Sequence, residues 1–124
     1  MGVEDHRSLS TTQSHDGSTL VVTCVGAAES DSFATLSTAL AAAHDDALKS
    51  SAPAVIADLR GLEFASSSCL KAFVTWLQRV QELDATRRYK VKFRSNPRFS
   101  WQRRSLGALA AFASSVVEIE TVAS

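Results

Sequence analysis

Two short stretches near the start of the chain have the composition of β-strands. Residues 8–13 and 18–26 are rich in β-branched and small apolar side chains. The residues between them, HDGS at 15–18, supply turn chemistry. The pattern predicts two antiparallel strands joined by this turn.

Helical spacing follows. Ser30, Asp31 and Ser32 are all suitable N-caps for a helix that ends near Lys49, before the break imposed by Pro53. Its apolar face is predicted to contain Phe33, Leu36, Leu40, Ala43, Ala47 and Leu48.

The middle of the chain predicts a second strand and a second helix. Residues 54–59, AVIADL, form a nearly continuous apolar run, typical of a strand inside a sheet. Residues 60–64, RGLEF, are predicted to turn and extend briefly. From Ser67 the spacing is helical up to residues 84–86, with an apolar stripe of Leu70, Phe73, Val74, Leu77 and Val80.

The C-terminal third adds a strand, a helix and a last strand. Residues 89–94, YKVKFR, alternate between apolar and basic, which places Tyr89, Val91 and Phe93 toward the core. Residues 101–113 predict a third helix, with Leu106, Leu109, Ala110 and Ala113 on its buried side, and VVEIETV (116–122) a final strand.

This order predicts a single α/β domain over residues 8–124, preceded by a flexible N-terminus, residues 1–7. Helix-linked strands favour right-handed crossovers and parallel neighbours. The first hairpin makes the small sheet mixed, and the alternating basic strand favours helices packed mainly on one face.

Composition fits a cytoplasmic, non-membrane domain. The chain has 124 residues, of which 45% are hydrophobic and 21% charged, as in soluble globular proteins. We find no apolar run long enough to cross a bilayer and no secretory signal. The spacing of Cys24 and Cys69 matches no metal or redox motif.

Charge is unevenly distributed although the net charge is zero. Residues 1–63 contain three basic and nine acidic side chains, and residues 64–124 contain ten and four. A basic segment at 87–104 raises nucleic-acid binding as a hypothesis. A solvated face is favoured, because we find no stacking motif or helix-turn-helix signature with it.

Small hydroxyl side chains gather where the second predicted helix begins. Ser66, Ser67 and Ser68 lie there, followed by Cys69. One serine is enough to cap the helix. A phosphate is also well tolerated at a helix N-terminus, and it would add about two negative charges to a small, neutral surface.

The stretch ADLRGLEFASSSCLKAFV, residues 57–74, resembles the signature of STAS domains, the fold of bacterial anti-sigma factor antagonists. Residues 21–40 are similar to an earlier family stretch, in which a strand ends in Gly and a helix follows. The family has Asp where this chain has Ser66, and Gly where it has Cys69. The positions that match the signature are Asp58, Leu59, Gly61, Phe64, Ser67, Ser68 and Leu70.

The resemblance implies a switch. In that family the unphosphorylated domain binds an anti-sigma factor, a serine kinase of the GHKL type, and phosphorylation ends the association. The position that matches the phosphoacceptor is Ser67. The implied partner-binding residues are Asp58, Ser66, Ser67, Ser68, Cys69 and Leu70.

The remaining chemistry favours a non-enzyme without cofactor or metal. His6, His15 and His44 are scattered, the glycines form no phosphate-binding loop, and we find no nucleophile with a base beside it. Trp76 and Trp101 are interpreted as core residues. A constitutive scaffold in a signalling assembly is the alternative function, nucleic-acid binding is less favoured, and self-association stays open.

Overall fold

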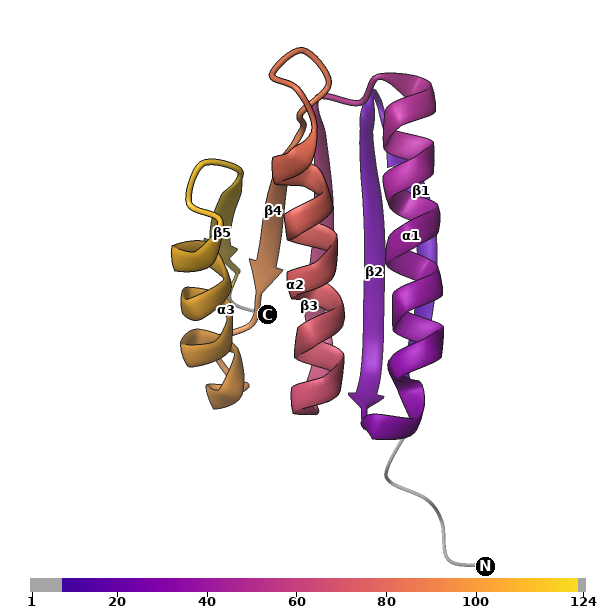
Figure 1. The fold of residues 1–124 in the computed structure, drawn as a ribbon. Helices are drawn as coiled ribbons and strands as arrows, with labels where there is room; N and C mark the ends of the chain where they lie inside the picture. Colours follow the sequence, from indigo (N-terminus) through magenta and orange to yellow (C-terminus); the bar gives the residue numbers. More distant parts are fainter. Residues whose placement is uncertain (1–7, 123–124) are drawn as a thin grey trace, which may run out of the picture.

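The computed structural model describes residues 8–122; the predicted flexible segment 1–7 and residues 123–124 lie outside the described residues. The described chain is a five-stranded sheet with three α-helices and one short 3-10 helix (Figure 1). Its elements are β1 (Ser10–Asp16), β2 (Thr19–Ala28), η1 (Ser30–Ser32), α1 (Phe33–Ser50), β3 (Ala54–Ala65), α2 (Ser67–Glu82), β4 (Lys90–Ser95), α3 (Ser100–Phe112) and β5 (Val117–Thr121).

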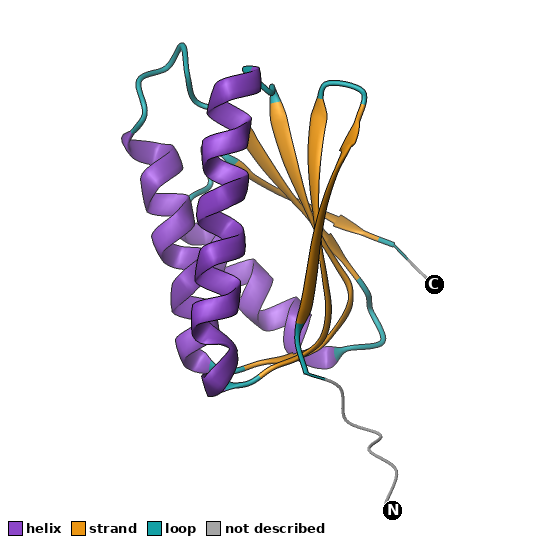
Figure 2. Ribbon diagram, turned by 90° about the vertical axis from the view of Figure 1, so that its right-hand side faces the viewer, coloured by secondary structure: helices purple, strands orange, loops and turns teal. Residues whose placement is uncertain are grey.

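The strands lie in the order β1-β2-β3-β4-β5, so that strands consecutive in the sequence are neighbours in the sheet. The β1–β2 pair is antiparallel and the other three pairs are parallel. All three α-helices cover the same face of the sheet (Figure 2). The mixed sheet, the hairpin and the one-sided helices confirm the predicted fold.

The core lies between the sheet and the helices, and alternation correctly predicted that Tyr89, Val91 and Phe93 belong to it. In β2 and β4 the inward side chains are fully or almost fully buried, among them Leu20, Val22, Val91 and Phe93. Phe73 and Trp76 of α2 meet Phe93 edge-on, with ring centroids 5.7 and 6.4 Å apart. This geometry adds a little to the free energy gained by burying the rings.

Two residues of the predicted apolar face of α1 are not fully buried: Leu48 is half-buried, and Phe33 is exposed. Leu36, Leu40, Ala43 and Ala47 are buried as expected, but Phe33 is 42% exposed. Phe33 is the first residue of α1. Helical spacing predicts the side of a helix on which a residue lies, but not whether another element covers it.

The turn predicted within residues 60–64 is absent, because β3 continues to Ala65; the brief extended segment predicted there is the end of that strand. Its pairing with β2 shifts register twice, once before Gly61 and once before Phe64. Each shift inserts one extra residue on β3, the signature of a β-bulge. Opposite the bulged part of β3 lies Gly26 at a φ of 101°, a conformation that glycine adopts readily.

In the second half of β3, side chains rather than a neighbouring strand make hydrogen bonds on the side that faces β4. Pairing with β4 ends at Asp58, which leaves the carbonyls that follow without a strand partner. The Nε2 of Gln102 donates to the carbonyls of Leu59 and Leu62, at 2.7 and 3.0 Å. The indole of the half-buried Trp101 also donates to Leu62, and the amide of Asn96 donates to the carbonyl of Arg60.

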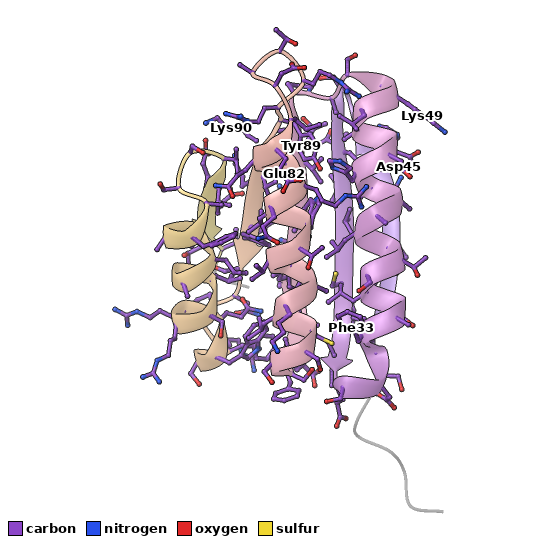
Figure 3. All side chains as sticks on the ribbon, in the orientation of Figure 1. Phe33, Asp45, Lys49, Glu82, Tyr89 and Lys90 are labelled. Carbon is purple, nitrogen blue, oxygen red and sulfur yellow. The ribbon has the colours of Figure 1, made fainter. Side chains whose placement is uncertain are left out.

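A buried polar cluster joins α1, α2 and the residue before β4. The Trp76 indole donates to the hydroxyl oxygen of Tyr89 at 2.8 Å, and that hydroxyl lies 2.7 Å from Nδ1 of His44. The Tyr89 oxygen accepts from Trp76, which leaves the hydroxyl proton of Tyr89 available to Nδ1 of a neutral His44. Both His44 and Tyr89 are buried. Figure 3 shows Tyr89 behind α2, toward the end of that helix.

We expect this cluster to make stability depend on pH. Burial, and then the nearby charge of Arg79, lower the pKa of His44 below its ordinary value of 6.5; Asp45 opposes them and Arg87 adds to them. As pH falls, the unfolded chain therefore takes up the proton before the folded chain does. The contribution of neutral His44 is fully present above about pH 6.5 and is lost below it.

Urea unfolding at a series of pH values measures this effect. The free energy of unfolding should fall below about pH 6.5, with at most about 1.4 kcal/mol per pH unit assignable to this single proton. His44→Gln should reduce that slope, whereas His15→Gln, at an exposed position of β1, should retain it. Equal slopes for the protein and His44→Gln would contradict the assignment.

Candidate functional site

The carboxyl ends of the parallel strands lie along one edge of the sheet, and α2 begins at that edge (lower side of Figure 1). Ser66 follows β3 directly, and its backbone N–H donates to the carbonyl of Ala28 at the end of β2. We call residues Ser66–Ser68 the serine turn. It is fixed by the strand that precedes it and by the helix that follows.

Ser66 caps α2. Its backbone is extended, with φ −69° and ψ 165°, and its Oγ accepts a hydrogen bond of 3.2 Å from the backbone N–H of Cys69. Such a cap contributes about 1 kcal/mol. The hydroxyl of Ser68 lies 3.3 Å from that of Ser66. Both of these side chains are half-buried, and their hydroxyls make contacts within the turn.

Ser67 differs from its two neighbours. It is exposed, and its hydroxyl makes no hydrogen bond to any of residues 8–122. It is the first residue of α2, and the first turn of that helix contains no acidic side chain. Because backbone N–H groups at a helix N-terminus have no intrahelical acceptor, a negative group on Ser67 would be favourable for the helix.

Cys69 and Leu70 lie beneath the serine turn. Cys69 is fully buried, and its thiol donates to the carbonyl of Glu29 at 3.3 Å, which ties α2 to the end of β2. Leu70 is half-buried against the core. Cys24 is a core residue: burial, with the charge of Asp58 second, raises its pKa to about 12. Neither thiol is accessible to a partner.

Asp58 lies apart from the serine turn. It is buried in the middle of β3, roughly 20 Å from Ser67 given the strand rise of about 3.3 Å per residue. Arg60 bonds both of its carboxylate oxygens, at 2.9 and 2.8 Å, and Arg94 lies 3.7 Å from one of them. Burial alone would raise the pKa of Asp58, but these hydrogen bonds and charges more than offset it and lower the pKa. Asp58 thus has a structural role: it holds Arg60 and Arg94 against β3.

Two exposed aromatic residues, which the sequence patterns did not mark as partner contacts, lie near the serine turn. Phe64, three residues before Ser67, is 47% exposed, because the second bulge of β3 turns it outward and buries Ala65 instead. Phe33 lines a shallow groove between α1 and α2 together with Ala72 and Trp76. Figure 3 shows Phe33 close to the end of the molecule where α2 begins.

The basic residues of segment 87–104 do not form one surface. Arg88 donates to the carbonyls of Gln81 and Leu83, and Lys90 donates to that of Ser115. Arg94 contacts Asp58 and Glu120 on the sheet face without helices. Arg103 and Arg104 lie on α3. A structural or solvated role accounts for these charges better than a groove for nucleic acid does.

Within residues 8–122, no three His, Cys, Asp or Glu side chains are grouped so that they could hold a metal ion. None of the helices described here is both long enough and apolar enough to cross a membrane.

Comparison with solved structures defines the class of fold. The chain is similar to an anti-sigma factor antagonist from Mycobacterium paratuberculosis, with a TM-score of 0.68 and 19% sequence identity over 90% of this chain and 85% of that chain. The domain therefore has the STAS-like fold predicted from residues 57–74. No protein-family model matches the chain, and no curated protein matches it.

Proposed function

We propose that this chain is a non-enzymatic cytoplasmic signalling module that acts as an anti-sigma factor antagonist. In this proposal it binds an anti-sigma factor that is also a GHKL-type serine kinase, and phosphorylation of Ser67 ends the association. Direct contact is made by the serine turn and Leu70, and Cys69 supports this surface from inside the domain, whereas Asp58 acts only on the stability of β3.

A single observation carries the proposal: Ser67 presents an exposed hydroxyl, free of hydrogen bonds to residues 8–122, at the N-terminus of α2. The STAS-like fold, shared with an anti-sigma factor antagonist, supports the class of function. Ser66 already caps the helix, so Ser67 is not needed for that purpose. A modification of Ser67 would therefore leave the fold intact.

The same geometry gives the switch its physical basis. A phosphate adds about two negative charges and three acceptor oxygens to a small neutral side chain. The helix N-terminus stabilises that charge in the free domain. In a complex the phosphate would be desolvated against the partner, which is costly unless the partner supplies matching donors.

Intact mass spectrometry tests the proposal. The protein is incubated with ATP and the GHKL-type serine kinase encoded nearest to its gene. We expect a gain of about 80 Da, the mass of one phosphoryl group, in the protein and in Ser68→Ala but not in Ser67→Ala. No gain, or a gain that survives Ser67→Ala, would contradict phosphorylation at Ser67.

Ser66 and Cys69 favour a second candidate, a constitutive scaffold. They occupy the positions where the resembled family has Asp and Gly. A kinase that recognises the Asp would meet a neutral hydroxyl engaged in capping. A stable complex that forms equally well with Ser67→Asp, together with no phosphorylation, would favour the scaffold over the switch.

A further inference from the structure

A groove between α3 and β5 has no part in the function proposed above. It has a volume of about 480 Å³ and lies where α3 begins and β5 ends. Its apolar lining includes Phe99, Ile119 and the nearly buried Leu106, and Ser100, Arg103 and Thr121 line its more polar part. This size and this mostly apolar lining are typical of small-molecule sites.

Incomplete cover by α3 opens the groove. Val117 and Ile119 lie on the helix-bearing side of β5, paired with the core residues Val91 and Phe93. Val117 is 8% exposed, whereas Ile119 is 40% exposed. A ligand that covers the exposed side chain of Ile119 would remove apolar surface from water, which is favourable.

The inner polar wall is held rigidly. Gln102 and Asn96 are buried, and both use their side chains to bond the backbone of β3 or of the β4–α3 turn. Within residues 8–122, no buried side-chain nitrogen or oxygen is without a hydrogen-bond partner. The polar groups of this wall already have hydrogen-bond partners. The wall can therefore contact the apolar part of a ligand without needing hydrogen bonds from it.

Arg103 is the one charged side chain among the described residues that line the groove. It is exposed, and its guanidinium makes no hydrogen bond or ion pair with residues 8–122. The acidic residues of β5, Glu118 and Glu120, face the other side of the sheet, where Glu120 pairs with Arg94. The groove is thus apolar with a single positive charge, complementary to an anionic group.

We propose that the α3–β5 groove binds a small amphiphilic anion, with its apolar body against Ile119, Phe99 and Leu106 and its negative group on Arg103. Inorganic phosphate has no apolar part and would leave the apolar lining of the groove uncovered. It is therefore not the class of ligand proposed. This site is separate from the serine turn, and its failure would leave the proposal for Ser67 untouched.

The test uses anilinonaphthalene sulfonate, an apolar anion whose fluorescence rises on binding, titrated into the full chain. We expect one saturable site. Arg103→Gln should weaken binding about fivefold, the effect of losing one exposed charge pair, and Ile119→Thr should weaken it about threefold. Arg104→Gln, a neighbouring exposed arginine outside the groove, is the matched control and should bind as the unmodified protein does.

A neutral analogue separates charge from apolar contact. Phenylnaphthylamine lacks the sulfonate, so Ile119→Thr should weaken its binding but Arg103→Gln should not. Circular dichroism melting should be unchanged in all variants, because these side chains are exposed. No binding, equal losses in Arg103→Gln and Arg104→Gln, or a dimer that Ile119→Thr dissociates would overturn the proposal; the last would mean that a second copy fills the groove.

Discussion

Replacing Ser67 with Asp is expected to weaken binding of the anti-sigma kinase by at least about a hundredfold, or about 2.7 kcal/mol. Ser67 is exposed at the start of α2, so the free domain tolerates the carboxylate and the helix N-terminus stabilises it slightly. In the complex that charge would lose its water, which costs several kcal/mol without a matching cation. Isothermal titration calorimetry with the purified kinase measures the loss.

Two controls make the result specific. Ser67→Ala removes the hydroxyl without adding charge and should bind within about threefold of the unmodified protein. Thr75→Asp places the same charge at an exposed position two turns along α2, and it should have a much smaller effect. If Ser67→Asp binds as tightly as the unmodified protein, the charge-based switch is wrong and the scaffold is favoured.

The periodicity of the sequence was sufficient for most of the architecture. The β-forming composition of residues 18–26 predicted a strand, and alternation in residues 89–94 predicted another, whose inward side chains Tyr89, Val91 and Phe93 are buried. Helical spacing predicted α2 and α3 to within a few residues. These patterns report local geometry directly, because the side-chain period of a strand differs from that of a helix.

The bulged half of β3 escaped prediction because its stability depends on distant residues. Gly61 in RGLEF reads as a turn signal, yet the strand continues against β2. The donors that satisfy its free edge come from Asn96, Trp101 and Gln102, more than thirty residues further on. No local pattern reveals such partners, and the same holds for the contact between His44 and Tyr89.

The candidate site was predicted in part for similar reasons. Helix-start chemistry and the family resemblance were enough to single out the serine turn, and Ser67 is indeed exposed. The resemblance also grouped Asp58 and Cys69 with it, although both are buried. Proximity along a motif does not determine which side chains reach the surface. The exposed Phe64 is likewise a consequence of the bulge rather than of its residue type.

Gln102→Leu is expected to lower the free energy of unfolding by about 3 kcal/mol, since each unsatisfied buried polar group costs about 1–3 kcal/mol. Leu has nearly the same volume as Gln but can make none of its hydrogen bonds. The backbone N–H of Asn96 and the carbonyl of Leu59 would lose their partners, at 2.8 and 2.7 Å, inside the protein. The carbonyl of Leu62 would keep the bond from Trp101.

Urea unfolding measures this change, with Gln78→Leu on the exposed side of α2 as the matched control, expected within about 0.5 kcal/mol of the unmodified protein. Hydrogen exchange then locates the damage. Because Gln102 holds the part of β3 that leads to Ser66, amides of residues 59–66 should lose more protection than those of β1. A loss of stability below about 1 kcal/mol, or uniform exchange, would mean that pairing with β2 alone keeps this segment in place. The serine turn would then owe its position to β2 rather than to α3.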